Sequence, residues 1–159
     1  MNVEYINPFL TAAISVFETM VGVKLVRQQP FVKKSMQPQN EVSGIIGLSG
    51  KAKGTVVLSI EREVALNATG VMLMERPGQI NADVVDAIGE LTNVIAGNAK
   101  AQLEHLNMSV GLPSVITGKG HCIDFPSHSK PIAIPFRCEW GDVVVEVGLV
   151  EEREEAAQT

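Results

Sequence analysis

The chain has 159 residues, of which 45% are hydrophobic and 19% charged, and its formal net charge at pH 7 is −5. This length suits one domain with a full hydrophobic core, and the composition argues against wholesale disorder. Because no basic run is longer than Lys33-Lys34 and there is only one Trp and one Tyr, the surface expected of a nucleic-acid-binding protein is missing. We expect a single domain over residues 1–150 and an acidic, non-periodic tail over residues 151–159.

The beginning of the chain is typical of a cytoplasmic protein. It carries Glu4 and lacks a basic leader, and its apolar stretch is broken by Pro8 and Glu18. Neither a signal peptide nor a membrane span fits this pattern, so no membrane association is expected. In the cytoplasm we expect Cys122 and Cys138 to be reduced thiols.

A helix and an edge segment are predicted first in the chain. Asn7 and Pro8 suit a helix cap followed by the first helical position, and apolar residues at helical spacing continue to Gly22, which ends the helix. Residues 23–34 indicate an extended segment, and Pro30 within it is typical of an edge strand or a bulge.

Two strands and a second helix follow. The strands are predicted over residues 41–48 and 55–60, joined by a turn rich in glycine and lysine. In the second strand apolar and polar residues alternate, which predicts a sheet with one covered face. Apolar residues at helical spacing then predict a helix over residues 61–74.

The clearest helical pattern spans residues 81–106. Asn81 is a good N-cap, and Asp83 places a negative charge in the first turn, where the helix dipole favours it. One side of this helix is apolar: Val84, Ile88, Leu91, Ile95, Ala99 and Leu106. The opposite side is polar or small: Asp86, Glu90, Asn93, Gly97, Lys100 and Glu104. The pattern predicts a long amphipathic helix with one side in the core and the other facing water or a partner.

The polar side of this helix has an unusual composition. Asn93 is a poor helix former, and Gly89 and Gly97 each cost roughly 1 kcal/mol relative to alanine. Glu90 and Asn93 present a carboxylate and a carboxamide one turn apart. The two glycines beside them have no side chains, which would let another backbone approach. On composition alone, the simpler interpretation is a solvated face with a few unfavourable residues.

The last part of the chain is predicted to be mostly strand. We expect a strand around residues 109–117, a polar loop over residues 118–130, and a hairpin over residues 132–149 that turns at Gly141-Asp142. The elements together predict an α/β (α+β) fold with about six mostly antiparallel strands, a long central amphipathic helix and two shorter helices. A long helix followed by three extended runs occurs twice, which hints at an old duplication.

Glu90 and Asn93, in Glu-x-x-Asn spacing with Asp86 four residues ahead of the glutamate, resemble the signature of the CheC/CheX/FliY phosphatases of bacterial chemotaxis. The stretches over residues 6–10 (INPFL) and 17–20 (FETM) resemble the CheX branch, so the likeness covers most of the chain. It implies a CheC-like, pseudo-symmetric fold with helices on an extended sheet.

The resemblance implies hydrolysis of the aspartyl-phosphate of a CheY-like response regulator. Asn93 would position the attacking water, since a carboxamide accepts from water and donates nearby, and Glu90 would pair with the regulator's lysine. Asp86, Gly89 and Gly97 are the expected partner-binding residues. The resemblance also implies that this chain binds no cofactor and that Mg²⁺ belongs to the receiver domain.

Three further features bear on this resemblance. The family pattern includes a downstream proline, and Pro113, the nearest candidate, comes slightly early. Members with two active helices repeat Glu-x-x-Asn in the first helix, but the comparable positions here are Glu18 and Val21, so we expect one working site. A homodimer in which edge strands join two sheets is also implied.

The sequence leaves several alternatives open. Asp86 and Glu90 could form an acid–base pair, although both are expected to be ordinary ionised carboxylates. Cys122 could act as a nucleophile beside His121, although neighbours on a strand point to opposite faces. A metal centre could be built from four residues: His121, Cys122, His128 and Cys138. The helix face could also belong to a non-catalytic adaptor that binds a response regulator or a flagellar protein, or to a structural protein in which it merely stays wet.

Overall fold

The computed structural model describes residues 3–35, 40–125 and 129–152, and these form three α-helices and eight strands. The helices are α1 (Val3–Val16), α2 (Arg62–Leu73) and α3 (Ala82–Ala101). The strands are β1 (Val26–Arg27), β2 (Phe31–Val32), β3 (Val42–Ser49), β4 (Ala52–Ile60), β5 (Ser109–Val110), β6 (Ser114–Thr117), β7 (Ile132–Cys138) and β8 (Gly141–Glu151). The predicted α/β class is confirmed, and the described strands exceed the predicted number because both edges are built from short pieces.

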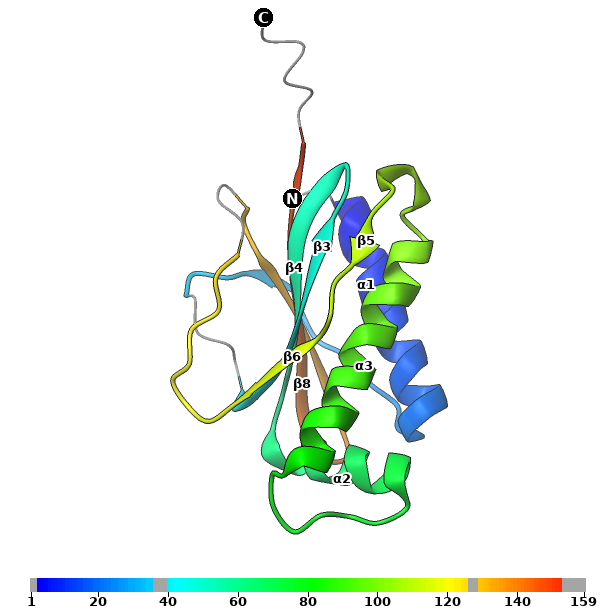
Figure 1. The fold of residues 1–159 in the computed structure, drawn as a ribbon, viewed down its shortest axis with the longest axis vertical. Coiled ribbons are helices and arrows are strands. Elements are labelled where there is room, and N and C mark those ends of the chain that lie inside the picture. Colours follow the sequence, from blue (N-terminus) through cyan, green and yellow to red (C-terminus); the bar gives the residue numbers. More distant parts are fainter. Residues whose placement is uncertain (1–2, 36–39, 126–128, 153–159) are drawn as a thin grey trace, which may run out of the picture.

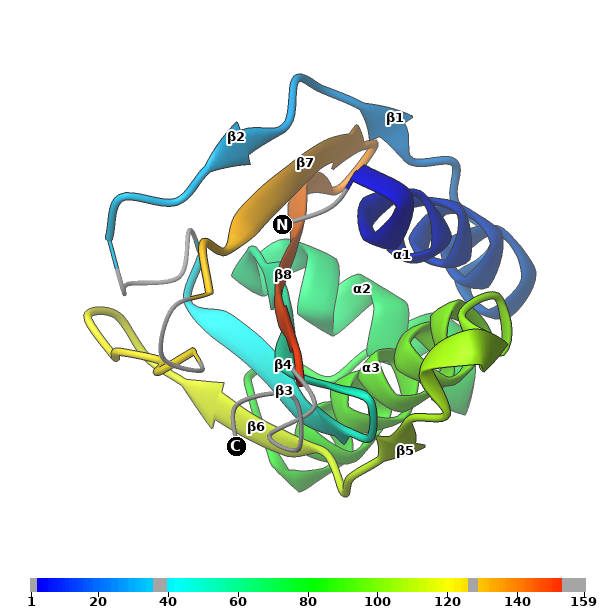
Figure 2. The same ribbon diagram turned by 90° about the horizontal axis from the view of Figure 1, so that it is seen from above.

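All of these strands belong to one antiparallel sheet. Its central order is β1-β7-β8-β4-β3-β5, with β2 also paired to β7 and β6 also paired to β3. Each edge therefore consists of two short strands that pair with the same long strand: β1 and β2 with β7, and β5 and β6 with β3 (Figure 2). The longest pairing joins β4 to β8, from Ala52↔Glu151 to Ile60↔Val143.

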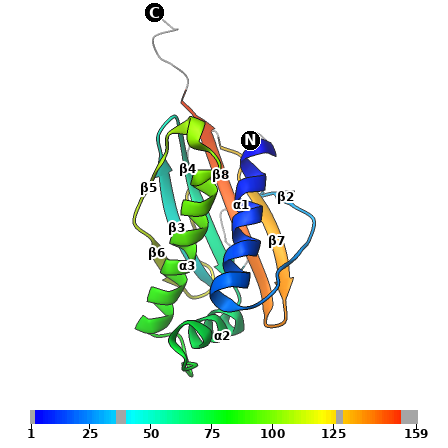
Figure 3. The same ribbon diagram turned by 90° about the vertical axis from the view of Figure 1, so that its right-hand side faces the viewer.

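Helices α1 and α3 lie side by side on one face of the sheet, and α2 lies across one end (Figures 1 and 3). The hydrophobic core fills the space between the helices and the sheet. Its bulkiest fully buried apolar side chains are Phe9, Phe17, Ile46, Leu58, Ile60, Leu66, Ile88, Leu91, Ile95, Ile134 and Phe136. Helical and alternating spacing in the sequence thus directs one stripe of each helix and one face of each strand into the same layer.

The predicted covered face is confirmed, and the other face of the sheet is also covered in part, although Lys53 on it is exposed. Val57 and Ser59 lie on this face of β4, and both are 0% exposed. Residues 118–125 (the covering segment) lie on the side of the sheet opposite the helices (Figure 1), and His121 in this segment bonds Ser43 of β3. Within it Ile123 is buried, and Phe125 packs so closely on Gly148 that a Cβ there would come within 2.7 Å of the ring.

Helix α1 begins earlier than predicted. Pro8 lies inside the helix and not at its first position. Tyr5 and Ile6 are buried, so their packing outweighs the hydrogen bond that the proline cannot make. The helix continues as a π-helical segment (Phe17–Val21) and ends at Gly22, whose φ is 76°. The predicted glycine stop is confirmed.

The β7–β8 hairpin is confirmed, but its turn comes earlier than Gly141-Asp142. Cys138 pairs with Gly141, so the two residues between them make the turn. Gly141 has a φ of 136°, and a Cβ there would clash with the Glu61 carboxylate, which accepts the Asp142 backbone N–H at 2.7 Å. The glycine is therefore required by this contact at the start of β8.

The strand predicted over residues 109–117 is interrupted. β5 and β6 both pair with β3, and residues 111–113 connect them. Gly111 donates its backbone N–H to the Gly47 carbonyl of β3 at 2.9 Å. The connection is thus tied to the sheet at its first residue.

Candidate active site on helix α3

Helix α3 begins as predicted. The side-chain oxygen of Asn81 accepts the Val84 backbone N–H at 3.1 Å and so caps the helix. The helix ends at Ala101, before the predicted residue 106, and a 3₁₀ turn (Glu104–Leu106) follows. The predicted apolar side is buried throughout: Val84, Ile88, Leu91, Ile95, Ala99 and Leu106.

The opposite side of α3 carries the predicted site residues. Asp86 and Glu90 are exposed, and Asn93 is half-buried. Among the residues that the structure describes, none of these three side chains has a hydrogen-bond or ion-pair partner. No buried side-chain nitrogen or oxygen lacks a partner in the same residues, so the unpaired amide of Asn93 must be open to solvent. An acid and an amide one turn apart are therefore available to another molecule.

The two glycines of this helix lie in different environments. Gly97 faces open space, since a Cβ built there would meet nothing within 4 Å. Gly89, expected on the same open side, is buried, and a Cβ there would lie 3.7 Å from Pro113 and from Val115. Gly89 therefore faces the β5–β6 connection and β6, and the low relief predicted beside Asn93 is provided by Gly97.

A close contact fixes α3 on the sheet. Thr92 is 0% exposed, and its hydroxyl donates to the Ile88 carbonyl at 2.7 Å. Gly44 of β3 lies against this side chain, and a Cβ built on it would clash with the Thr92 hydroxyl. Only glycine allows this approach, so the contact sets the position from which Glu90 and Asn93 project. This contact was not predicted, because nothing near Gly44 in the sequence marks it as the partner of a helix.

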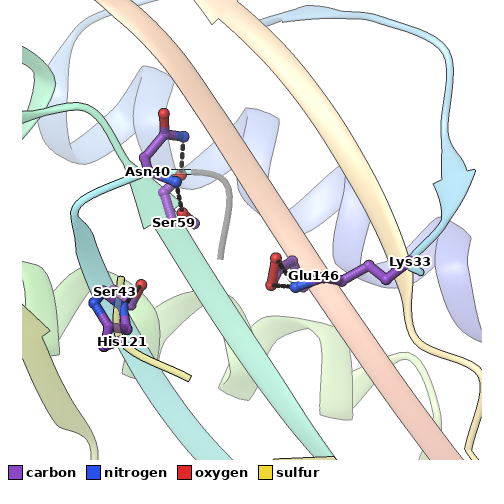
Figure 4. Close-up of polar contacts among 6 residues, drawn as sticks. All are labelled: Lys33, Asn40, Ser43, Ser59, His121 and Glu146. Carbon is purple, nitrogen blue, oxygen red and sulfur yellow. Dashed lines mark hydrogen bonds and ion pairs between the residues drawn. The ribbon is translucent and has the colours of Figure 1, made fainter. Parts of the chain in front are cut away.

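A second polar group lies buried on the covered face of the sheet (Figure 4). Lys33 Nζ lies 2.5 and 2.8 Å from the two carboxylate oxygens of Glu146, and the two side chains are 2% and 0% exposed. Burial raises the pKa of the Glu146 carboxyl above its ordinary value, and nearby Lys33 and His121 only partly offset this effect. This pair was also missed, although a lone glutamate within the valine-rich run of residues 143–147 was a signal for it.

Two hydroxyls accompany this ion pair. His121 donates from Nδ1 to the Gly118 carbonyl at 2.7 Å, so in the neutral ring its Nε2 accepts from the Ser43 hydroxyl at 2.9 Å. The Ser59 hydroxyl accepts the Asn40 backbone N–H at 2.8 Å. These groups are satisfied inside the protein, and the bond of His121 to Ser43 holds the covering segment on the sheet.

The alternatives that used cysteine and histidine gain no support from this geometry. Cys122 is exposed and Cys138 is half-buried, and both are free thiols. Because both ring nitrogens of His121 are engaged, this histidine is not free to activate Cys122. Within the described ranges no three His, Cys, Asp or Glu side chains are grouped to hold a metal, and His128 lies outside those ranges.

The candidate site is an open helix face. A hollow of about 490 Å³ lies elsewhere, where Glu61, Arg62 and Trp140 contribute to its lining, and it contains neither Glu90 nor Asn93. Small-molecule sites are usually concave and enclose most of their ligand. An unpaired acid and amide on a convex helix are better suited to entering a site on another macromolecule.

Solved structures define the class of protein to which this fold belongs. The fold matches a CheC-like superfamily protein from Shewanella sp. PV-4 with a TM-score of 0.86 and 35% identity, covering 94% of this chain and 99% of that one. The CheC-like fold that the resemblance implied is thereby confirmed. None of the described helices has the length and apolar character needed to cross a bilayer.

Sequence comparison then gives the family. The model of the chemotaxis phosphatase CheX family matches residues 42–137, a stretch that contains all of α3. The chain therefore belongs to the CheX family. The CheY-P phosphatase CheX of Thermotoga maritima is 26% identical over 123 residues, which are 75% of this chain and 79% of that protein. A chain of the CheX–CheY–BeF₃–Mg²⁺ complex from Borrelia burgdorferi is 26% identical with a TM-score of 0.80, covering 94% of this chain and 100% of that one.

Proposed function

We propose that this protein hydrolyses the aspartyl-phosphate of a CheY-like receiver domain through the outer side of α3. The observation that carries the proposal is the pair formed by Glu90 and Asn93 on a helix that the core holds in place; neither side chain has a partner among the described residues. Membership in the CheX family supports it, as does the Thermotoga maritima relative that is a CheY-P phosphatase. The Borrelia burgdorferi complex supports a CheY-like partner.

The proposed chemistry is attack of water on an acyl phosphate. Asn93 would accept a hydrogen bond from the water and hold it in line with the phosphorus–oxygen bond that breaks. A new bond forms between the water oxygen and phosphorus, the aspartate carboxylate leaves, and the water proton ends on phosphate or solvent. Asn93 acts by positioning, which can supply several kcal/mol of the barrier as an order of magnitude.

Other groups would assist without taking part in bond breaking. Glu90 would pair with a lysine of the receiver and so fix the depth and angle at which Asn93 enters. Asp86, one turn before Glu90 and exposed, would extend this acidic contact, and Gly97 would leave room for the partner's backbone. Gly89 is buried against Pro113, so we assign its role to seating the helix. The Mg²⁺ needed for phosphoryl chemistry would be held by the receiver.

The homodimer implied by the family stays a prediction. The β1–β2 edge of the sheet offers an apolar surface for it, since Val26, Phe31 and Val32 are 54%, 41% and 51% exposed. Long or apolar strand edges are prone to pair with another chain. Light scattering coupled to size exclusion would measure the mass in solution.

Substitution of Asn93 tests the proposed function. With CheY-like receiver domains of the same organism phosphorylated by acetyl phosphate, Asn93→Ala should lower the catalysed rate of phosphate release by about 100-fold, the usual scale for loss of one positioning group. Alanine is the better helix former, so stability should be unchanged or slightly higher. Asn98→Ala is the matched control, because Asn98 is an exposed asparagine on the same helix.

The same assay separates the alternatives. A wild-type protein that binds the phosphorylated receivers but does not accelerate their decay would overturn the phosphatase and favour the adaptor. Equal activities of the Asn93→Ala and Asn98→Ala variants would remove Asn93 from the mechanism. If substitutions of Glu90 and Asn93 change neither binding nor turnover, this face of α3 is only a solvent-exposed surface without a functional role.

A further inference from the structure

The β5–β6 connection, residues 111–113, forms a wall beside the candidate site. A Cβ at Gly89 would lie 3.7 Å from the Pro113 ring, so this side of α3 faces the connection. Asn93 lies one turn further along the helix, at roughly 40° from Gly89 around the axis, whereas Glu90 lies at roughly 100°. Asn93 is therefore placed between Glu90 and the connection. The chain from β5 to β6 runs along α3 (Figure 1).

Leu112 is the exceptional residue of this wall. It is 91% exposed, although its neighbours on both sides are held in place. Gly111 is tied to the Gly47 carbonyl at 2.9 Å, and Ser114 is already paired in β6 with Ile45. A lone exposed leucine is ordinary on a protein surface. This one differs because it is fixed at the rim of an otherwise polar site that must receive another protein.

Flexibility alone does not account for the exposed side chain. A Cβ at Gly111 would lie 3.2 Å from the Gly47 carbonyl, so the connection runs close to β3. Proline restricts the backbone on the other side of Leu112, because its ring fixes φ and limits the residue before it. The apolar side chain is thus presented outward by a constrained backbone.

We propose that Leu112 is a docking residue that packs on an apolar patch of the receiver domain next to the phosphorylated aspartate. The inference rests on the proposed function of the same site and adds a binding contact to it. Covering a leucine side chain completely is worth about 1.5–3 kcal/mol. The contact is made before and during the reaction alike, so it lowers KM for the receiver without changing kcat.

The test compares two exposed apolar residues. Leu112→Asp and Met74→Asp replace side chains of 91% and 93% exposure with the same charge, and Met74 lies at the end of α2 with a φ of 63° that aspartate tolerates. Both variants should match the wild type in Tm. We expect Leu112→Asp to raise KM for the phosphorylated receiver about tenfold, equivalent to about 1.4 kcal/mol, with kcat unchanged. Met74→Asp should leave KM as it is.

A conservative variant and the wild-type control keep the outcomes distinct. Leu112→Met should restore a KM near that of the wild type, because it returns apolar area at the same place. Unchanged KM in Leu112→Asp, with an active wild type, overturns the docking role alone. A fall in kcat at constant KM also overturns it, because the residue would then act on the reaction. A wild type that neither binds nor dephosphorylates the receivers overturns the proposed function and this inference together.

Discussion

Two polar regions of this molecule use their hydrogen-bonding groups in opposite ways. On the covered face of the sheet Lys33 pairs with Glu146, and the neighbouring serines are also bonded within the chain. On the outer side of α3, Glu90 and Asn93 have no side-chain partner in the part of the chain that the structure describes. The first region is closed by a covering segment, and the second is open.

The difference separates architecture from recognition. A buried polar group must find a partner, so the polar atoms of the covered face hold Lys33, Asn40 and His121 against the sheet. An exposed polar group has water, and lack of a partner alone proves nothing. What distinguishes α3 is that its backbone is fixed by a buried stripe and by the contact of Thr92 with Gly44, while Glu90 and Asn93 bond no other side chain of the described ranges. A fixed helix whose outer side chains are unpaired is suited to inserting those side chains into a site on another protein.

The largest effect should come from breaking the buried ion pair. Lys33→Met leaves the Glu146 carboxylate buried without its cation, and we expect the free energy of unfolding to fall by about 3–5 kcal/mol. Urea denaturation measures this loss. At temperatures where the variant stays folded, phosphatase kcat should equal that of the wild type, because the pair belongs to the other region.

The double variant Lys33→Met/Glu146→Met is the control for that experiment. Replacing both charges with apolar side chains of similar length should recover most of the lost stability. A double variant as unstable as the single one would mean that packing, and not the unpaired charge, is responsible. Reduced kcat in folded Lys33→Met would break the proposed separation of the two regions.

Gly44→Ala should produce the next largest effect, and it should reach both stability and activity. The added Cβ clashes with the Thr92 hydroxyl, so we expect a loss of about 1–3 kcal/mol and a lower kcat, as α3 is displaced. Gly47→Ala on the same strand is the matched control, since a Cβ there meets nothing within 4 Å. Adding Thr92→Ala to Gly44→Ala should restore activity. Full activity in Gly44→Ala alone would contradict the fixed seat of the helix.

The smallest expected effect is the pH dependence of the unfolding free energy that Glu146, on the covered face, contributes. Because burial raises the pKa of Glu146, this carboxyl contributes stability that is fully present below its ordinary pKa of 4.5 and is lost as the pH rises through the raised value. The difference in unfolding free energy between the wild type and Glu146→Gln should therefore decrease across that window. Urea denaturation at a series of pH values measures it, and a difference independent of pH would refute the shift.

Local patterns predicted the parts of this structure that local chemistry decides. The cap at Asn81, the buried stripe of α3 and the stop at Gly22 depend on residues within one or two turns, and all are confirmed. The early start of α1 before Pro8 was not predictable, because it depends on core packing. The position of the last hairpin's turn was not predictable either, because the Glu61 carboxylate that bonds the Asp142 backbone N–H is distant in the sequence.

The sequence predicted which residues to consider at the site but not their surroundings. Glu90 and Asn93 lie on the open side of α3 as expected, since helical spacing alone decides that. Gly89 was misplaced because its neighbour, Pro113, comes from another part of the chain. The pairing of Lys33 with Glu146 spans 113 positions, which no periodic pattern records.

Strand β8 is the last strand along the described chain, yet it lies between β7 and β4 in the sheet. Until it is in place, the strands on its two sides belong to separate halves with no ladder between them. The sheet therefore cannot close during folding before β8 joins these two halves. We expect folding to be slower than that of helical proteins of similar size, since the joining contacts are distant in sequence.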